Sequence, residues 1–332
     1  MKNVHSWVLG NGGLLGSHLS RELRQAKYLH ISINPWQGEQ KRWAWNEPQT
    51  LALQLSESFN EFLRTAYEEK SYWMLFWAAG TGVVSSTEES LKKETEIWVT
   101  VLSCLEKALI ELGEDLPGFI FFASSAGAVY GDCKNGVITE NSPCTPISFY
   151  GRNKLRQEKM LEEWCARHPQ TSYLIGRIAN LYGPGQNLLK SQGLISHISK
   201  SLLSKRPVHI YMPLDTIRDY IYVEDCASHI VQCALKIYQT SRARAPLRLI
   251  KIFASEQSSS LYQIIGTFSR IAKRSPKITC VPTVKLGQHP KKVRFQSLIW
   301  NQNKNSYRTH LPSGIARVYH DHLKLIQNGQ LH

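Results

Sequence analysis

The chain has 332 residues, of which 42% are hydrophobic, and a formal net charge of +14. It contains no run of 18 or more apolar residues, so we expect no transmembrane helix. Residues 1–16 lack the basic, apolar and small-residue blocks of a signal peptide. Because the positive charge is spread along the whole chain, we interpret it as an affinity for phosphates at most.

The cysteines indicate a reducing compartment. There are seven, an odd number, and no two of them form a C-x-x-C pair. We therefore expect no disulfide framework and predict a cytoplasmic protein. His320 and His322 resemble part of a ligand cluster, but two neighbouring histidines do not supply the convergent ligands of a metal site. No bound metal is predicted.

The first 180 residues alternate short apolar runs with segments of helical periodicity. Such alternation predicts parallel strands joined by helical crossovers, and so a parallel sheet covered on both faces. The expected strands are Val4–Leu9, Tyr28–Ile33, Tyr72–Trp77, Phe119–Ala123 and Ser172–Ile178, and the expected helices are Gly13–Gln25, Gln49–Tyr67, Thr87–Leu112 and Phe149–Arg167.

After Gly183 the pattern loosens, and no linker separates the two halves, so we expect them to pack together. Predicted helices are Leu194–Leu203, Val223–Tyr238, Leu261–Ile271 and Ile315–Ile326, with short strands near Val208–Tyr211, Leu249–Phe253 and Lys277–Val281. Gln239–Pro246 and Gln288–Val293 are predicted to be basic loops.

A glycine-rich segment connects the first strand to the first helix. It reads Gly10-Asn11-Gly12-Gly13-Leu14-Leu15-Gly16. At this position Gly10 permits a tight turn, Gly12 and Gly13 allow the backbone to approach a pyrophosphate, and Gly16 allows close packing of helix on sheet. The N-terminus of the helix favours negative charge. We therefore predict a dinucleotide-binding loop.

The end of the second strand carries no acidic residue. An acid that binds the ribose is expected about 20 residues after the glycines, where the chain has Asn34. Asn34 can form one hydrogen bond with a ribose hydroxyl, and its neutrality does not repel a 2′-phosphate. Lys41 and Arg42 are close enough in sequence to bind such a phosphate. The choice between NAD and NADP therefore stays open.

Tyr150 and Lys154 are the candidates for proton transfer. A spacing of four places both on one face of a helix. A nearby ammonium favours the phenolate form of a tyrosine, which can then act as a base near neutral pH. Ser124 and Ser125 end the strand that precedes this helix, and the carboxyl ends of strands are where open α/β sheets build their sites.

Taken together and in this order, these motifs resemble the extended short-chain dehydrogenase/reductase family, in its NAD-dependent epimerase/dehydratase branch. The resemblance covers about residues 4–323. Besides the glycine loop, Tyr150 and Lys154, the matching segments are Ala78-Ala79, Ser124-Ser125, Val129-Tyr130-Gly131, Arg177-Ile178-Ala179-Asn180-Leu181-Tyr182-Gly183-Pro184-Gly185 and Arg218-Asp219-Tyr220-Ile221-Tyr222-Val223-Glu224-Asp225.

The resemblance implies a Rossmann-type doubly wound sheet over residues 1–182, rejoined by 216–240. It implies a smaller, intertwined substrate-binding α/β region formed by 183–215 and 241–332. It also implies a homodimer, with the helices Thr87–Leu112 and Phe149–Arg167 forming a four-helix interface to which Leu105, Leu109 and Leu161 belong unless they are core residues.

The resemblance also implies residue roles. Ser125, Tyr150 and Lys154 align with the catalytic set, and Asn180 and Arg218 align with residues that contact the phosphates of a nucleotide sugar. A guanidinium suits that contact because it can bind phosphate through two donors; the alternative for Arg218-Asp219 is a surface ion pair. Cofactor contacts are expected from Gly10, Asn11, Gly12, Gly13, Leu14, Leu15, Gly16, Asn34, Ala78, Ala79, Tyr150 and Lys154.

Several positions depart from the family pattern. Trp77 stands where the family often has histidine, and the run beginning at Glu94 stands where it usually has an asparagine. An expected R-P-x-D-like loop reads His289-Pro290-Lys291-Lys292, with Arg294 as a substitute for its arginine. Ala126-Gly127 replaces the Asp-Glu pair of the 4,6-dehydratases, so the dehydration reaction lacks an acid to protonate the leaving hydroxyl.

We therefore predict a nucleotide-sugar epimerase, acting at C4, with a bound nicotinamide cofactor. One alternative is an NAD(P)H-dependent nucleotide-sugar reductase or dehydrogenase. A second, suggested by the charge of +14, is a non-catalytic nucleotide- or RNA-binding protein on the same fold. The retained Ser125, Tyr150 and Lys154 argue against this last alternative and against a nucleic-acid partner.

Overall fold

A computed structural model describes residues 2–25, 31–36, 38, 42–113, 116–131, 136–188, 193–281, 291–300 and 309–330. The chain forms two compact units and passes between them repeatedly. Unit 1 comprises Met1–Ser124, Ser148–Gly176 and Ala227–Ile250, and unit 2 comprises Ser125–Ile147, Arg177–Cys226 and Lys251–His332.

A six-stranded sheet forms the centre of unit 1, with the order β2-β1-β3-β4-β5-β9. The pairs β1–β2, β1–β3 and β3–β4 are parallel, which confirms the predicted α/β class. Its strands are β1 (Lys2–Leu9), β2 (Ile31–Pro35), β3 (Tyr72–Trp77), β4 (Gly118–Ser125), β5 (Thr171–Ile178) and β9 (Arg248–Phe253). Residues 28–30 of the predicted second strand lie outside the described residues.

The strand order reverses direction between β1 and β3. From β1 the chain moves outward to β2 and then returns to the other side of β1 as β3. The carboxyl ends of strands at such a reversal are where open α/β sheets bind ligands. Gly10 follows β1 and Ala78 follows β3, so the topology brings both predicted cofactor-binding segments to this place.

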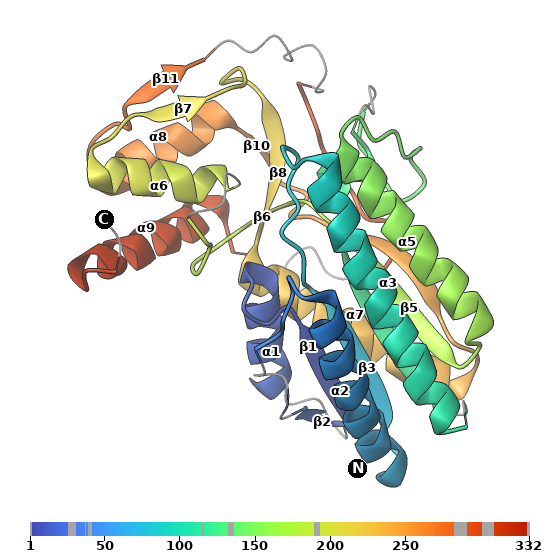
Figure 1. The fold of residues 1–332 in the computed structure, drawn as a ribbon. Coiled ribbons are helices and arrows are strands. Elements are labelled where there is room, and N and C mark those ends of the chain that lie inside the picture. The colour runs from blue at the N-terminus through green and yellow to red at the C-terminus, as the bar shows by residue number, and fades with distance from the viewer. Residues whose placement is uncertain are drawn as a thin grey trace. The chain divides into compact units, whose positions relative to one another are not determined.

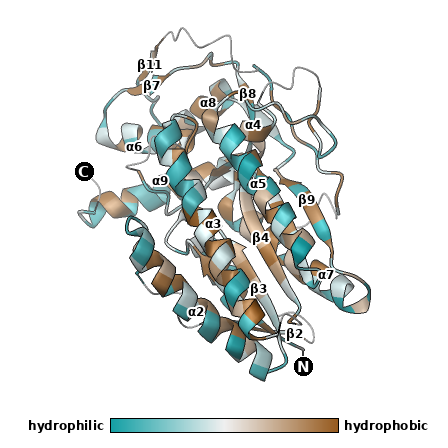
Figure 2. Ribbon diagram, turned by 45° about the vertical axis from the view of Figure 1, so that its right-hand side comes forward, coloured by the Kyte–Doolittle hydropathy of each residue, from teal (hydrophilic) through white to brown (hydrophobic). Residues whose placement is uncertain are grey.

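Helices cover both faces of this sheet. The helices α2 (Pro48–Glu68), α3 (Glu88–Glu111) and α5 (Phe149–Arg167) lie side by side over one face (Figure 1). On the opposite face, α1 (Leu14–Gln25) packs on β1 and β2, and the Tyr238 ring of α7 (Val223–Ala243) lies 4.9 Å from that of Tyr72. In Figure 2 the strands β3 and β4 are hydrophobic, whereas the helices beside them carry both hydrophobic and hydrophilic residues. This is expected of helices that bury one face against a sheet and expose the other to solvent.

The core under α2, α3 and α5 is unusually aromatic. Leu105, Leu109 and Leu161, the possible interface residues, belong to this core and are buried. Its large rings are Trp7, Trp36, Phe59, Phe62, Trp73, Trp77, Trp98, Phe122, Trp164 and Tyr173. Tilted and edge-to-face ring pairs add to the free energy gained by burying these side chains and fix the packing of the helices on the sheet.

Local capping sets the start of the helix that carries the predicted base. The Ser148 hydroxyl accepts a hydrogen bond from the Gly151 amide at 3.1 Å, so α5 begins at Phe149. Tyr150 therefore lies in the first turn, and Lys154 lies one turn later on the same face. The predicted boundaries of α5 and of β3 are confirmed.

Unit 2 contains two small sheets and three longer helices. One sheet has the order β10-β8-β6, formed by β10 (Ser258–Ser260), β8 (Ile217–Tyr222) and β6 (Asn180–Tyr182), and the other pairs β11 (Ile278–Cys280) with β7 (Val208–Ile210). The helices α6 (Leu194–Ser204), α8 (Leu261–Ala272) and α9 (Leu311–Gln327) pack on one another, and α4 (Ala126–Val129) is a single turn. They enclose a separate apolar core.

One loop prediction needs correction. Gln239–Pro246 is not all loop, because α7 continues to Ala243, and the Arg244 amide still donates to the Thr240 carbonyl. Nothing in the sequence breaks the helix before Pro246. Of the predicted loop Gln288–Val293, residues 288–290 lie outside the described residues, and residues 291–293 form no strand or helix beyond an isolated β-bridge between Lys292 and Ile217. Among the described helices, none combines the length and apolarity that crossing a bilayer requires.

Candidate active site

The glycine loop is sterically specified at two positions. Gly10 has a φ of +96°, and a Cβ atom there would lie 2.5 Å from the Ala79 amide nitrogen. A Cβ atom on Gly16 would lie 2.1 Å from the Gly10 carbonyl oxygen. The turn is closed by the Gly13 amide, which donates to Gly10 at 2.9 Å. Only glycine fits at residues 10 and 16 without a backbone shift.

The remaining residues of the loop leave room for a ligand. A Cβ atom on Gly12 would meet nothing within 4 Å, and α1 begins at Leu14 with no acidic side chain in its first turn. Asn11 is half-buried, whereas Leu15 is buried. Open space beside Gly12 at the N-terminus of a helix suits a pyrophosphate, so this loop fits the phosphates of a dinucleotide.

Asn34 lies on β2, opposite His5 of β1. Its side chain is half-buried, and its Oδ1 atom accepts a hydrogen bond of 3.3 Å from Ser32. Arg42 is exposed, and Lys41 lies outside the described residues. This position can therefore offer a neutral amide to a ribose, as the sequence predicted, and NAD and NADP remain equally compatible with it.

Ala78 and Ala79 form the wall opposite the glycines. The Ala78 amide donates to the Leu9 carbonyl at 2.9 Å, which ties the ends of β3 and β1 together. Trp77, which replaces the family's histidine, turns into the core instead, with its ring centroid 5.0 Å from that of Trp98. Its indole Nε1 has no hydrogen-bond partner among the described atoms. The substitution therefore serves packing.

Tyr150 and Lys154 are brought together by α5. The Lys154 Nζ atom lies 5.8 Å from the centroid of the Tyr150 ring and 5.3 Å from that of Phe122. The Lys154 side chain is buried, whereas Tyr150 is half-buried. An ammonium near a partly accessible phenol is the arrangement that a tyrosine base requires.

The Lys154 ammonium is held by two side chains. Its Nζ atom lies 3.0 Å from Glu94 Oε1 and 3.2 Å from Gln157 Oε1. Burial alone would lower the pKa of Lys154, but the charges of Glu94, Tyr150 and Glu158 outweigh it and raise that pKa. Burial likewise works against ionised Glu94, but Lys154 and the amides of Gly82 and Thr81 lower the pKa of its carboxyl. Both groups are therefore charged.

The structure distinguishes the two serines at the end of β4. The Ser124 hydroxyl is buried and donates to Glu158 Oε1 at 2.5 Å. Ser125 is half-buried at the start of α4, and its side chain makes no capping hydrogen bond there. Of the two hydroxyls, that of Ser125 is the better placed to serve a ligand.

Asn180 and Arg218 lie on neighbouring strands of unit 2. Asn180 pairs in register with Tyr220, and its Nδ2 atom donates to the Asp219 carbonyl at 2.8 Å. The Arg218 Nη1 atom donates to the carbonyls of Ile217, at 2.8 Å, and Lys291, at 3.3 Å. Burial lowers the pKa of the half-buried Arg218. A guanidinium positioned through one nitrogen keeps other donors for an anion.

Arg218 and Asp219 do not form the surface ion pair considered above. Asp219 is fully buried, and its Oδ1 atom accepts from the Ser255 amide at 2.8 Å. Its Oδ2 atom has no partner among the described atoms. Burial raises the pKa of Asp219 to about 6.

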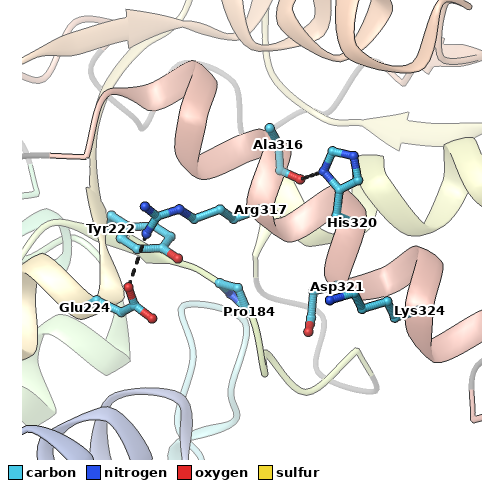
Figure 3. A pocket seen from close by; sticks show the side chains of 8 residues that line it. All are labelled: Pro184, Tyr222, Glu224, Ala316, Arg317, His320, Asp321 and Lys324. Carbon is cyan, nitrogen blue, oxygen red and sulfur yellow. Dashed lines mark hydrogen bonds and ion pairs between the residues drawn. The ribbon is translucent and has the colours of Figure 1, made fainter.

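A separate pocket of about 380 Å³ lies in unit 2 (Figure 3). Arg317 of α9 crosses it, 5.3 Å above the Tyr222 ring and 3.2 Å from Glu224 Oε2. None of the site residues predicted from the sequence lines this pocket. Its lining residues are Pro184, Tyr222, Glu224, Ala316, Arg317, His320, Asp321 and Lys324.

The C-terminal histidines are not arranged as metal ligands. The His320 Nδ1 atom lies 2.7 Å from the Ala316 carbonyl oxygen, and that of His322 lies 2.9 Å from Ser199 Oγ. Within the described ranges, no three residues of the metal-binding types come together.

Sequence reasoning missed several residues that support the predicted site. Glu94 was noted only as a departure from the family, and Gln157 and Glu158 were not considered. Glu94 had a signal: it lies within the apolar stripe of α3 that contains Leu91 and Trp98. A carboxylate on such a stripe needs a buried partner.

Tyr130 and Arg177 come from two of the family motifs and support each other in unit 2. The Arg177 Nη1 atom donates to the Tyr130 hydroxyl at 2.7 Å. Burial, offset by Arg177, raises the pKa of Tyr130 to about 12. These motif residues therefore have a structural role here, and Tyr130 stays protonated.

Comparison with known proteins places these motifs in a family. The model of the "NAD dependent epimerase/dehydratase family" matches residues 7–243. The chain belongs to this family. The resemblance inferred from the sequence is thereby confirmed.

Relatives within this family differ in the reactions their names describe. The chain is 30% identical to dTDP-L-rhamnose 4-epimerase of Burkholderia thailandensis over 132 residues, 37% of this chain and 36% of that one. The match thus spans about a third of that relative's length. It is 26% identical to dTDP-4-dehydro-6-deoxyglucose reductase of Escherichia coli over 69% of this chain and 72% of that one.

A solved structure supports the fold. The UDP-glucose 4-epimerase of Thermus thermophilus, in complex with NAD, has a TM-score of 0.72 with this chain. The two are 18% identical, and the superposition covers 97% of this chain and 99% of that one. At this identity the likeness establishes the shared architecture.

Proposed function

We propose that the chain is a nucleotide-sugar epimerase that acts at C4 with a tightly bound nicotinamide dinucleotide, NAD or NADP. The observation that carries the proposal is the pairing of Tyr150 with the buried Lys154 ammonium. Three kinds of support join it: the family, the glycine loop at the strand reversal, and relatives named as 4-epimerases.

Residues 10–16, Asn34, Ala78 and Ala79 are proposed to hold the dinucleotide, which would supply a nicotinamide ring able to accept a hydride from the sugar and to return it. Tyr150 takes the proton of the sugar hydroxyl and gives it back at the end of the reaction. Lys154 stabilises the phenolate of Tyr150 and contacts the cofactor ribose.

Ser125, Asn180 and Arg218 are proposed to serve the substrate. Ser125 forms a hydrogen bond with the sugar oxygen whose proton Tyr150 takes. Asn180 and Arg218 bind the diphosphate, which suits the amide and guanidinium donors on neighbouring strands β6 and β8. No acid follows Ser125, since residues 126 and 127 are Ala and Gly, so a dehydratase reaction is not proposed.

The test is to incubate the purified protein with UDP-glucose, UDP-galactose and their N-acetyl forms without added reductant. Interconversion of the C4 epimers supports the proposal. The protein is also denatured, and the released dinucleotide is identified by mass. A protein that retains no dinucleotide and converts no sugar nucleotide would refute the epimerase assignment.

The second candidate is a nucleotide-sugar reductase, favoured by the Escherichia coli relative of that name, which matches over most of both chains. The same residues would serve it, with Tyr150 donating a proton to a keto sugar. Net consumption of NADPH with a 4-keto sugar nucleotide identifies this reaction. The comparisons favour either enzyme over the non-catalytic alternative that the net charge suggested.

We also propose that the protein is a cytoplasmic homodimer. Six cysteines in the described part of the chain are free thiols, as a reducing compartment favours. On α3, Val99 and Ile110 are 44% and 55% exposed and lie three turns apart on one face, beside α5. Light scattering at micromolar concentration tests the dimer, and a monomer would contradict it.

A further inference from the structure

We propose that Glu94 is a positioning residue that sets the protonation of Tyr150 through Lys154. This inference rests on the proposed function, because it concerns the proposed base. The Glu94 and Lys154 side chains, which lie 3.0 Å apart, are only 7% and 5% exposed. At such burial their charges are weakly screened and act on every titratable group nearby.

The Glu94 carboxylate is held in place from two sides. Its Oε1 atom contacts Lys154, and its Oε2 atom accepts from the amides of Gly82, at 2.8 Å, and Thr81, at 3.1 Å. These amides belong to the segment that follows Ala78-Ala79 after β3. Glu94 thus joins the proposed cofactor wall to the helix that carries the proposed base.

The ring of Tyr150 lies close to the same segment. A Cβ atom on Gly82 would be 2.9 Å from Glu94 Oε2 and 3.3 Å from Tyr150 Cδ2. The phenol of Tyr150 therefore experiences both charges of the pair. Lys154 favours its phenolate, whereas Glu94 disfavours it and so reduces the acidifying effect of the lysine.

Other groups that face Lys154 come from the elements packed around it. Besides Glu94 of α3, the charged and titratable neighbours are Tyr150 and Glu158 of α5, and β4 contributes the uncharged Phe122 ring. Glu158 accepts a hydrogen bond from the Ser124 hydroxyl. The Glu94 carboxylate lies 3.0 Å from the Lys154 ammonium and is the largest of the charge effects that raise the pKa of Lys154.

Stability alone does not explain why an ion pair is buried at this position. Burying an ion pair costs the hydration of both charges. Replacing the whole pair by well-packed apolar side chains often leaves the free energy of unfolding unchanged. A glutamine has one acceptor oxygen, so it could accept from Lys154 or from the Gly82 and Thr81 amides, but not from both sides. A glutamine also carries no negative charge. The charge of Glu94 is therefore the property to which we assign an effect on Tyr150.

The experiment compares Glu94→Gln with the control Glu96→Gln, which removes an exposed carboxylate from the same helix. Loss of a buried negative charge lowers the pKa of the Tyr150 phenol and of the Lys154 ammonium alike. We therefore expect the pH profile of kcat/KM to move to lower pH by about one unit in Glu94→Gln and not in the control. Glu94→Asp, which keeps the charge, should retain the wild-type profile.

A second readout does not depend on turnover. The ultraviolet absorbance of tyrosinate is titrated, and the curve of each protein is corrected with its Tyr150→Phe counterpart to isolate Tyr150. The midpoint should fall by about one unit in Glu94→Gln. If the midpoint shifts but no sugar nucleotide is converted, the proposed function fails and the role of Glu94 stands. Turnover with an unmoved profile and midpoint overturns the role of Glu94 alone.

A double variant covers the case in which Glu94→Gln does not fold. The variant Glu94→Gln/Lys154→Gln removes both charges, so no buried charge is left unpaired. If the two charges offset each other at Tyr150, its tyrosinate midpoint stays near the wild-type value. A midpoint as high as that of the Lys154→Gln single variant would show that Glu94 has no influence on Tyr150 and would overturn the proposal.

Discussion

The Gly10 carbonyl oxygen occupies the space that a side chain on Gly16 would need: a Cβ atom at residue 16 would lie 2.1 Å from it. The turn after β1 and the first turn of α1 are therefore in direct backbone contact. Beside it, a Cβ atom on Gly12 would meet nothing within 4 Å, and this open space is where phosphates are proposed to bind.

We predict that Gly16→Ala displaces the turn, so that the purified protein loses its dinucleotide and its thermal unfolding temperature falls. Gly12→Ala is the matched variant, since its Cβ atom would meet no protein atom within 4 Å. It should keep the wild-type unfolding temperature in the cofactor-free protein but bind the dinucleotide more weakly. Mass analysis of the released cofactor and calorimetry measure both effects, and equal behaviour of the variants would contradict the prediction.

Tyr150→Phe removes the proposed base without changing the ring. We expect kcat to fall roughly 10²- to 10⁴-fold, the usual contribution of a positioned acid–base group. Cofactor content should be unchanged. Tyr262→Phe, at an exposed tyrosine of α8, is the control and should retain full activity. Steady-state kinetics on the epimer pair measure the loss, and an active Tyr150→Phe enzyme would eliminate this residue as the base.

The two serines of β4 should separate stability from catalysis. Ser124→Ala leaves Glu158 without its buried donor and should lower the free energy of unfolding by about 1–3 kcal/mol. Ser125→Ala should leave the free energy of unfolding unchanged and lower kcat instead. Urea unfolding gives the free energy of unfolding of both variants, and steady-state kinetics gives their kcat. The assignment of Ser125 is wrong if its variant is destabilised and fully active.

Asp219 should make stability depend on pH. Its pKa is raised by burial from 3.8 to about 6, so the folded state favours the protonated form. This contribution is fully present below about pH 4 and is lost as the pH rises through about 6. Two units correspond to about 3 kcal/mol. Compared with Asp219→Asn, the wild-type protein should therefore lose roughly that much stability between pH 4 and pH 7. Denaturant unfolding at several pH values measures the free energy of unfolding of both proteins. Parallel curves of this free energy against pH would contradict the prediction.

Much of unit 1 was predictable because its signals are local. The strand Tyr72–Trp77 and the helix Phe149–Arg167 were predicted at their observed boundaries, since apolar runs and a serine cap depend on neighbouring residues only. The glycine loop was predictable for the same reason. The strands β6 (NLY), β8 (IRDYIY) and β10 (SSS) of unit 2 were not predicted, because polar residues interrupt or replace the apolar run that marks a buried strand such as β3.

The amino-acid sequence by itself determined the α/β class, the glycine loop and the spacing of Tyr150 and Lys154, which are properties of adjacent residues. Only the tertiary structure decided that Lys154 is bound by Glu94, 60 residues away, and that Ser124 is bound by Glu158. It also showed that Asp219 is buried rather than paired with Arg218. The physical reason is that the partner of a buried charge is chosen by packing, which brings together side chains that no sequence spacing relates.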